Sequence, residues 1–147
     1  MEFTIKEGSI EEAVEMCNLL PEFEKPYGKE EFEERLKRKE YLILICYYYG
    51  MPIGFKLGYD RYDDGSFYSW LGGVLPGFRR NGVAGRLQER QEIWVREHGY
   101  QRILIKTRNK FQNMLRFSIA HGYYIIGFKE KGLIKDYRVV LQKELNW

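Results

Sequence analysis

The sequence has few of the features that mark secreted, metal-binding or membrane proteins. It contains two cysteines, Cys17 and Cys46, which lie in apolar segments without the spacing of metal ligands. This placement indicates buried free thiols and supports neither a disulfide framework nor a metal site. No apolar stretch approaches the roughly 18 residues that a membrane span requires, and no N-terminal signal pattern is present. We therefore expect a cytoplasmic protein with no metal and no membrane partner.

The sequence also lacks a block of residues with the same charge. The net charge is +3 and the sequence pI is about 8.8, with both signs interspersed along the chain. Because a nucleic-acid binder is expected to cluster its basic residues on one face, we expect no nucleic-acid partner. In the densest charged run, Lys29–Glu40, three glutamates are each followed four positions later by a basic residue, which predicts a solvated helix face. These pairs are Glu31 with Arg35, Glu33 with Lys37, and Glu34 with Arg38.

The composition is that of a globular chain, with 44% hydrophobic and 31% charged residues. A chain of 147 residues with this composition is expected to form a single domain, residues 1–147, with its own core. Aromatic residues make up 16% and include 12 tyrosines, which is more than a core alone usually needs. Some of them are expected to line a groove, with simple packing as the equal alternative.

Hydrophobic periodicity predicts a succession of strands and helices. Ser9 and Glu12 form a capping box at the start of the first helix, and Gly99 is placed for a left-handed cap after the third. A strand, helix, strand passage over residues 67–107 predicts a parallel crossover that follows three antiparallel strands. The predicted fold is α+β, with a mixed, mostly antiparallel central sheet of about six or seven strands flanked by helices on both faces. The expected strands are 3–8, 41–49, 53–59, 67–74, 101–107, 123–128 and 137–141, with a turn at 50–52, and the expected helices are 10–20, 29–40, 82–98 and 109–122.

One segment combines basic and small residues where an expected strand becomes a helix: LPGFRRNGVAGRL, Leu75–Leu87. A helix N-terminus offers backbone N–H groups without intrahelical partners and about half a positive charge. Gly82 and the small residues after it let a ligand approach that backbone. Arg79 and Arg80 supply donors suited to phosphate oxygens. The segment therefore predicts a pyrophosphate site, although it has neither the Gly-Lys-Ser/Thr end of a P-loop nor the spaced glycines of a dinucleotide fingerprint.

The stretch VLPGFRRNGVA, Val74–Ala84, resembles the signature of the GNAT acetyltransferase superfamily, in which Val-x-Pro is followed by Gln/Arg-x-x-Gly-x-Gly/Ala. The order of elements over nearly the whole chain is similar to that of the family, and so is GYY at 122–124. The resemblance implies an acetyl-CoA site. For the pyrophosphate it implies Arg79, Arg80, Asn81, Gly82, Val83 and Ala84, and for the pantetheine amides Gly72, Gly73 and Val74.

The resemblance also implies an asparagine near the pantetheine. Asn109 and Asn113 both qualify, and neither has the ideal spacing before Gly122. Asn109 is preferred because it lies where the expected strand ends. For either asparagine, capping of the following helix is an equal alternative.

The chemistry that the resemblance implies is direct attack of an amine on the thioester, with the Val74 N–H as a donor to the oxyanion. Many family members use a tyrosine of the last helix to protonate the leaving thiolate, and this position holds Ser118 here. Serine donates a hydrogen bond but is a poor acid. Ser118 is therefore expected to orient a water molecule, or the thiolate leaves without help; a small core residue is the alternative.

The loop between the first two helices, which in the family borders the acceptor groove, contains Glu22, Glu24 and Tyr27. One of the two glutamates is expected to bind or deprotonate a cationic amine, with a solvated loop as the alternative. Tyr68 and Trp70 share one face of their strand by its period of two. They are expected to wall the groove or to pack under a helix.

The resemblance and these residues together predict an N-acetyltransferase that transfers the acetyl group of acetyl-CoA to a primary amine of a small molecule or a protein. The alternative is a non-catalytic acyl-CoA-binding module of the same fold, in which the missing tyrosine reflects lost chemistry. The identity of the acceptor amine and the oligomeric state, monomer or homodimer, stay open.

Overall fold

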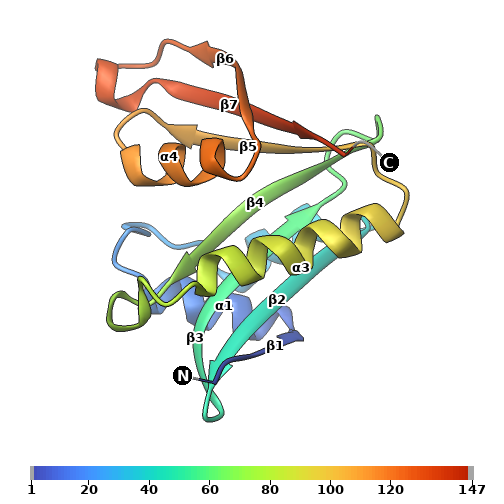
Figure 1. The fold of residues 1–147 in the computed structure, drawn as a ribbon, viewed down its shortest axis with the longest axis vertical. Coiled ribbons are helices and arrows are strands. Elements are labelled where there is room, and N and C mark those ends of the chain that lie inside the picture. Colours follow the sequence, from blue (N-terminus) through green and yellow to red (C-terminus); the bar gives the residue numbers. More distant parts are fainter. Residues whose placement is uncertain (1, 146–147) are drawn as a thin grey trace. The chain divides into compact units, whose positions relative to one another are not determined.

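The computed structural model describes residues 2–145 (Figure 1). Its strands are β1 (Thr4–Glu7), β2 (Tyr41–Tyr48), β3 (Met51–Tyr59), β4 (Ser66–Val74), β5 (Arg102–Arg108), β6 (Tyr124–Lys129) and β7 (Arg138–Glu144), and its helices are α1 (Ile10–Leu19), α2 (Lys29–Leu36), α3 (Val83–Glu97) and α4 (Gln112–Ala120), with short 3-10 helices η1 (Pro76–Phe78) and η2 (Ile134–Asp136). The seven strands follow the order β1-β2-β3-β4-β5-β7-β6. β4 and β5 pair in parallel, whereas β1–β2, β2–β3, β5–β7 and β6–β7 are antiparallel. The predicted mixed sheet and its parallel crossover are therefore confirmed.

The chain divides into two compact units, and each is described on its own. Unit 1 comprises the residues up to Asp60 together with Trp70–Trp94. Unit 2 comprises Arg61–Ser69 and the residues from Val95 onward. The division falls within β4 and within α3, so each of these two elements contributes one end to each unit.

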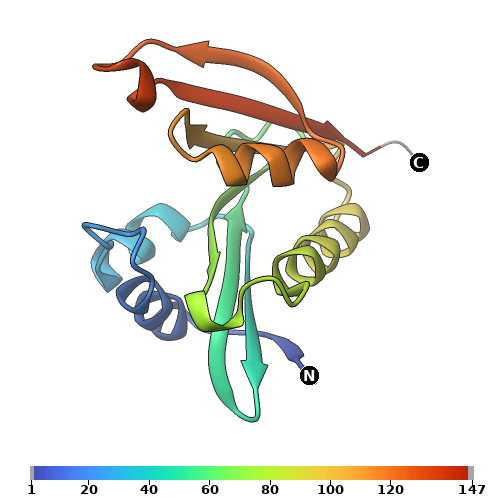
Figure 2. The same ribbon diagram turned by 60° about the vertical axis from the view of Figure 1, so that its left-hand side comes forward.

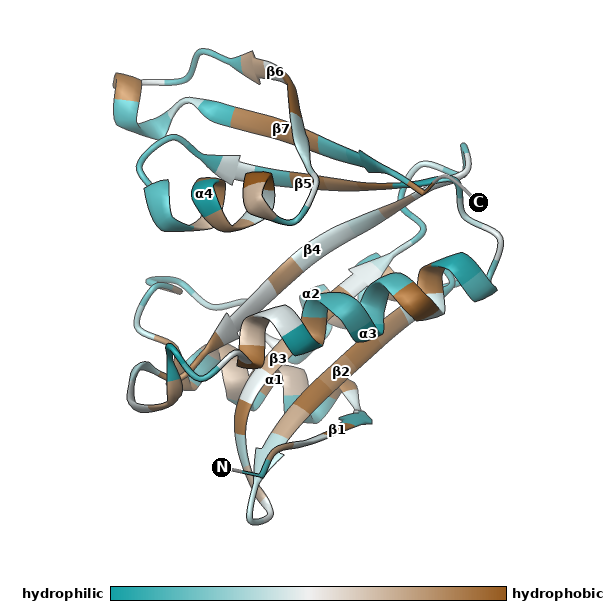
Figure 3. Ribbon diagram, viewed as in Figure 1, coloured by the Kyte–Doolittle hydropathy of each residue, from teal (hydrophilic) through white to brown (hydrophobic). Residues whose placement is uncertain are grey.

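In unit 1, α1 and α2 lie on one face of the strands and α3 lies on the other (Figure 2). The central strands are apolar over much of their length, as the colouring of β2 shows (Figure 3). Residues 42–46 of β2 are all buried. A continuous buried run of this kind is expected of a strand that is covered on both faces.

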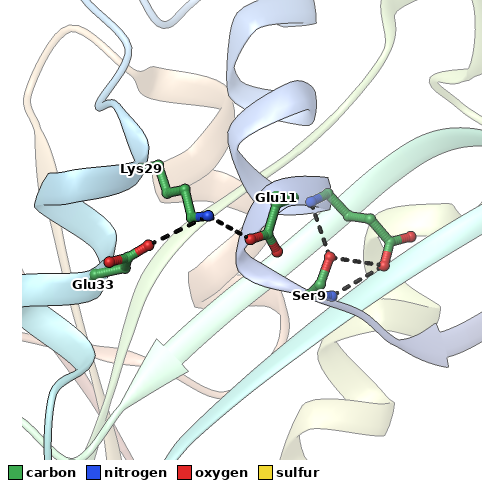
Figure 4. Close-up of polar contacts among 5 residues, drawn as sticks. Ser9, Glu11, Lys29 and Glu33 are labelled. Carbon is green, nitrogen blue, oxygen red and sulfur yellow. Dashed lines mark hydrogen bonds and ion pairs between the residues drawn. The ribbon is translucent and has the colours of Figure 1, made fainter.

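The first helix begins as predicted. The Glu12 N–H donates to the Ser9 hydroxyl at 3.2 Å, and the Ser9 N–H donates to the Glu12 carboxylate at 3.0 Å, which confirms the capping box (Figure 4). In the same view Lys29 bridges Glu11 of α1 and Glu33 of α2, with N–O distances of 2.9 and 3.6 Å. The cap and the ion pairs fix the start of α1 and join it to α2.

The second helix is shorter than predicted. α2 ends at Leu36, and Arg38 adopts a left-handed conformation with a φ of 60°. The predicted pair of Glu31 with Arg35 is confirmed, with an N–O distance of 2.9 Å. The other two predicted pairs are wrong, because their basic partners lie beyond the end of the helix.

The turn between β2 and β3 comes earlier than predicted. Tyr49 and Gly50 occupy it with φ values of 49° and 78°, as a two-residue type I′ turn requires. Pro52, which was expected in the turn, lies in β3 opposite Tyr47, where the register shifts after Cys46. A proline has no N–H to donate to a regular ladder of hydrogen bonds. It is therefore tolerated where the ladder is already interrupted.

The third helix buries a stripe at helical spacing. In unit 1, Val83, Leu87 and Gln91 are 1%, 2% and 0% exposed. Ala84, in the first turn of α3, is exposed. The buried face is therefore partly polar, and the first turn of α3 keeps a small residue at the surface.

A lysine of β3 is buried beneath this helix. Lys56 is 7% exposed, and its ammonium group has no hydrogen bond or ion pair among the described residues. A Cβ on Gly72 would lie 3.6 Å from the Lys56 Cγ, and a Cβ on Gly54 of β3 would lie 3.3 Å from Val83 of α3. Burial lowers the pKa of Lys56 to about 8, because removal from water disfavours the charged form.

This lysine makes the stability of the protein depend on pH. Between a pH of about 8 and the ordinary lysine pKa of 10.5, the unfolded chain binds more protons at Lys56 than the folded chain does, so the free energy of unfolding rises with pH. The contribution of Lys56 to this rise is about 3 kcal/mol. We expect Lys56→Met to be more stable than the wild type at pH 7.5, and this advantage to shrink by about 3 kcal/mol at pH 10.5.

Urea unfolding of both proteins at these two pH values measures the difference. Lys25→Met, at an exposed lysine, is the control and is expected to follow the wild type at both pH values. An unchanged stability difference between the wild type and Lys56→Met would contradict a buried, charged Lys56.

In unit 2, β5 and β7 form the centre of the sheet. Ser66–Ser69 of β4 pair with Arg102–Ile105 of β5, and β6 forms the other edge. One face of these strands carries buried side chains, among them Ile103 and Leu141, and α4 covers this face. Before β5, Gly99 has a φ of 82°, which confirms the predicted left-handed cap.

Candidate active site

The end of β4 in unit 1 departs from a regular strand. The Trp70 ring lies 5.2 and 5.3 Å from the rings of Tyr27 and Phe32, so Trp70 points toward α2. A Cβ on Gly73 would lie 2.8 Å from Leu20 Cδ1 at the end of α1, so Gly73 faces the same side. Strict alternation would put residues three apart on opposite faces. β4 therefore contains a bulge between Trp70 and Gly73.

Close packing explains both glycines at this bulge. A Cβ on Gly72 would lie 3.3 Å from the Phe55 carbonyl oxygen, and a Cβ on Gly73 would lie 3.2 Å from Glu22 Oε1. Their lack of side chains thus has a cause within the chain itself. The role of Gly72, Gly73 and Val74 in pairing with pantetheine stays a prediction.

One edge of β4 is free where the predicted cofactor strand ends. Pairing with β5 covers Ser66–Ser69, and on that side the described residues provide no strand partner for Trp70–Val74. The Leu75 N–H donates to the Ile53 carbonyl of β3 at 2.8 Å. Because successive N–H groups of a strand point in opposite directions, the Val74 N–H points away from β3. An extended ligand with amide groups can add to such an edge like a further strand.

Left-handed residues shape the backbone between β4 and α3. The φ values of Arg80 and Gly82 are 66° and 77°. The Gly82 carbonyl accepts the first hydrogen bond of α3, from the Arg86 N–H at 3.1 Å, and the N–H groups of residues 83–85 have no acceptor among the described residues. Left-handed residues beside free N–H groups form a concave site for an anion.

The two arginines of this loop are placed differently. Arg79 Nη2 lies 3.0 and 2.9 Å from the two carboxylate oxygens of Glu22, and Arg79 Nε donates to the Val74 carbonyl at 2.8 Å. Arg79 therefore ties the loop after α1 to the end of β4. Arg80 and Glu24 are both exposed, and neither side chain has a polar partner among the described residues. Of the predicted charged residues, these two are the ones left available to a ligand.

Tyr27 and Trp70 belong to an aromatic cluster in unit 1 that already contains a cation. The cluster comprises Tyr27, Phe32, Tyr59 and Trp70. The Arg35 guanidinium carbon lies 4.5 Å from the centre of the Trp70 ring and 5.4 Å from that of Tyr27. Trp70 is 8% exposed. Packing therefore accounts for Trp70, and its predicted contact with the acceptor stays a prediction.

The two asparagines of unit 2 have structural contacts of their own. Asn109 Nδ2 donates to the Ile134 carbonyl at 3.2 Å, and Asn113 Oδ1 accepts from Arg116 at 3.4 Å. The N-cap of α4 is Phe111, with no side-chain cap. The helix-capping alternative is therefore wrong for both asparagines, and their role toward the cofactor stays a prediction.

Ser118 is buried in α4 of unit 2. It is 1% exposed, and its hydroxyl has no hydrogen-bond partner among the described residues. Most buried polar groups are paired, so an unpaired one requires an explanation such as a missing ligand or water. Tyr68, the remaining predicted residue of the acceptor groove, is 5% exposed, and its ring lies 6.2 Å from that of Tyr62.

Other kinds of site find little support in the described part of the chain. It contains no group of three or more His, Cys, Asp or Glu residues that could hold a metal ion. Cys17 and Cys46 are free and buried, and burial raises the pKa of Cys17 to about 12, which keeps this thiol protonated and unreactive. Among the residues described, no helix has the length and apolar character needed to span a membrane.

Comparison with known proteins assigns the family. The sequence model of the Acetyltransferase (GNAT) family matches residues 12–123. The chain belongs to the GNAT acetyltransferase family. No curated protein matches the chain in a search by sequence.

Solved structures share the fold at low sequence identity. The ribosomal-protein-S18-alanine N-acetyltransferase from Escherichia coli has a TM-score of 0.84 at 12% identity, covering 99% of this chain and 96% of its own. Ard1 from Thermoplasma volcanium has a TM-score of 0.83 at 18% identity, with full coverage of both chains. A GNAT family acetyltransferase from Elizabethkingia anophelis with acetyl-CoA bound has a TM-score of 0.76 at 18% identity, covering 97% of this chain and 98% of its own. These similarities show the fold.

Sequence reasoning missed three features of the site and of the core beside it. The first is the Arg79–Glu22 ion pair, which joins residues 57 positions apart. The second is the contact of Arg35 with the Trp70 ring, because the sequence placed Arg35 only on a solvated helix face. Lys56 had one visible signal, since it is the single charged residue in the apolar strand IGFKLGY.

Proposed function

We propose that this chain is a single-domain, cytoplasmic N-acetyltransferase that transfers the acetyl group of acetyl-CoA to a primary amine by direct attack. The observation that carries the proposal is the backbone between β4 and α3. Left-handed Arg80 and Gly82 stand beside N–H groups without acceptors, in the stretch that matches the family signature. This arrangement suits the pyrophosphate of the cofactor.

The free edge of β4 suits the rest of the cofactor. Trp70–Val74 can pair with the amides of the pantetheine arm as with an added strand. Arg79 donates to the Val74 carbonyl, and the Leu75 N–H of the same peptide donates to Ile53, so the backbone directly after the Val74 N–H is fixed before the substrate arrives. We assign the Val74 N–H as a donor to the oxyanion of the tetrahedral intermediate, where preorganised donors have the largest effect.

The acceptor amine has to lose a proton before it attacks. For an ordinary alkylamine with a pKa of about 10.4, this costs about 4.6 kcal/mol at pH 7. Glu24 is the better placed of the two predicted glutamates, because its carboxylate is exposed and unpaired. Glu22 is bound by Arg79, and we assign it to positioning the loop.

Ser118 is proposed to assist departure of the thiolate. We expect Ser118→Ala to lower kcat about 10-fold, which is below the usual range of about 10²–10⁴-fold for acid catalysis because serine is a poor acid. The free energy of unfolding should not fall, because the substitution removes a buried hydroxyl that has no partner. Steady-state kinetics and urea unfolding measure the two effects. Unchanged turnover would end the catalytic assignment of Ser118.

Release of free thiol from acetyl-CoA in the presence of a panel of primary amines tests the proposed function. Amine-dependent release with stoichiometric N-acetyl product is the expected result. Binding of acetyl-CoA without release for any amine would favour the alternative, a non-catalytic acyl-CoA-binding module.

A further inference from the structure

The charges of the chain are divided unequally between the two units. Unit 2 contains 12 of the 24 Lys and Arg residues but only 6 of the 21 Asp and Glu residues, which gives it a net charge of +6. Unit 1 contains the other 12 basic and 15 acidic residues, a net charge of −3. The modest charge of the whole chain therefore hides a strongly basic unit.

The sheet of unit 2 gathers part of this charge on one face. In the register of β5 with β7, Lys106 lies opposite Val140 and Arg108 lies opposite Arg138. Side chains alternate along a strand, so these residues point away from the face where Ile103 is buried. Lys106 and Arg138 are exposed. The face opposite α4 is therefore basic.

Two tyrosines hold two cations at the β4 side of this face. The Arg61 guanidinium carbon lies 5.4 Å from the centre of the Tyr62 ring and 5.2 Å from that of Tyr68. The Lys106 ammonium lies 5.2 and 5.7 Å from the same two rings. Contacts of this kind restrict long, flexible side chains. We call these four residues, Arg61, Tyr62, Tyr68 and Lys106, the tyrosine–cation site.

The two cations of the tyrosine–cation site have no recorded carboxylate partner among the described residues. Arg61 and Lys106 are exposed, and neither has an ion pair within the part of the chain that the structure describes. Asp64 is occupied by Ser66 and by Arg102, whose Nη2 lies 3.3 Å from its carboxylate. Asp136 lies 3.8 Å from Arg108. Two fixed positive charges are thus left for an external anion.

We propose that the tyrosine–cation site binds a carboxylate of the acceptor, so that the preferred substrate is a primary amine that carries a carboxylate group. The inference rests on the proposed function, since Tyr68 is one of the residues assigned to the acceptor groove. Arg61 offers a fork of donors that matches a carboxylate, and Lys106 adds a compact charge. Because the tyrosine rings already restrain both cations, binding loses little side-chain freedom.

Matched acceptors test the preference. The wild-type chain is given acetyl-CoA with the C-terminally amidated tripeptides Ser-Glu-Glu, Ser-Gln-Gln and Ser-Lys-Lys, and with the small pair 4-aminobutanoate and 4-aminobutanamide, so that only the acidic member of each pair carries a carboxylate. We expect kcat/KM to be at least about 10-fold higher for the acidic member of a pair than for its amide, the factor that one charge-assisted hydrogen bond provides. The peptide and small-molecule arms distinguish a protein acceptor from a small one.

The double variant Arg61→Gln/Lys106→Gln is expected to reduce the preference to less than about 3-fold, mainly through a higher KM for the acidic acceptor. The control is Lys131→Gln/Lys135→Gln, which removes the same charge from exposed lysines of unit 2 outside the site. This control should keep the preference. If the site variant keeps it, or the control loses it equally, the proposal is overturned.

Calorimetric titration of the same tripeptides into the protein gives a readout that does not need catalysis. Tighter binding of Ser-Glu-Glu than of Ser-Gln-Gln, lost in the site variant, supports the site. If this binding pattern appears but no amine is acetylated, the site stands and the proposed function fails. If amines are acetylated with equal kcat/KM and bind equally, the function stands and the inference fails. Equal binding without any acetylation overturns both.

Discussion

Replacement of Gly82 by valine is expected to raise the Kd for acetyl-CoA about 100-fold. Gly82 has a φ of 77°, and a β-branched residue in this region costs about 1–3 kcal/mol. The loop would relieve this strain by rotating its N–H groups away from the pyrophosphate. Loss of one or two charge-assisted hydrogen bonds, at about 1.5–3 kcal/mol each, corresponds to the expected change.

The matched control for this substitution is Gly132→Val. Gly132 in unit 2 also has a positive φ, 67°, and a Cβ at either glycine would meet nothing within 4 Å. The two variants therefore carry similar backbone strain, and their melting temperatures should fall by similar amounts. Calorimetric titration should find normal acetyl-CoA affinity in Gly132→Val. Equal affinity in both variants would remove the signature loop from the cofactor site.

Replacement of Trp70 by alanine is expected to lower the free energy of unfolding by about 3–5 kcal/mol. The Trp70 ring contacts Tyr27, Phe32 and Tyr59, with ring centres 5.2–5.6 Å apart. Arg35 stacks on it at 4.5 Å. Truncation would leave a cavity in the aromatic cluster and remove the surface on which the guanidinium rests. Urea unfolding measures the loss, and Tyr49→Ala, at a residue 82% exposed, is the control with little expected effect.

A second variant separates packing from acceptor binding. Trp70→Phe retains an aromatic ring in the cluster, leaves a smaller cavity, and should therefore cost clearly less stability than Trp70→Ala. If Trp70 also walls the acceptor groove, this variant changes the KM for the amine while it retains more stability than Trp70→Ala. A loss of stability in Trp70→Ala below about 1 kcal/mol would contradict its place at the centre of the cluster.

Local signals in the sequence were sufficient for much of the fold. The capping box at Ser9 and the left-handed Gly99 depend on residues within one turn of each other, so the pattern contains the whole interaction. The buried run of β2 and the alternation around it likewise define where the central strands lie. The end of α2 was missed because Arg38 adopts a left-handed conformation that its residue type disfavours.

The candidate site was less accessible to sequence reasoning. The signature loop is contiguous, so its residues could be named together. The partners of Arg79, Arg35 and Lys56 come from distant parts of the chain, and which cation meets which carboxylate or ring depends on tertiary packing. For the same reason Glu22 and Glu24 looked equivalent in the loop, whereas only Glu22 meets Arg79 in the structure.

Calorimetric titration of acetyl-CoA into the wild-type protein decides whether the loop between β4 and α3 is a cofactor site. We expect one acetyl-CoA to bind per chain with a Kd in the micromolar range. Three or four charge-assisted hydrogen bonds to the pyrophosphate provide about this strength after the cost of immobilising the ligand. Absence of detectable binding at millimolar acetyl-CoA would leave the fold and family in place and would contradict the cofactor site and the proposed acetyl transfer.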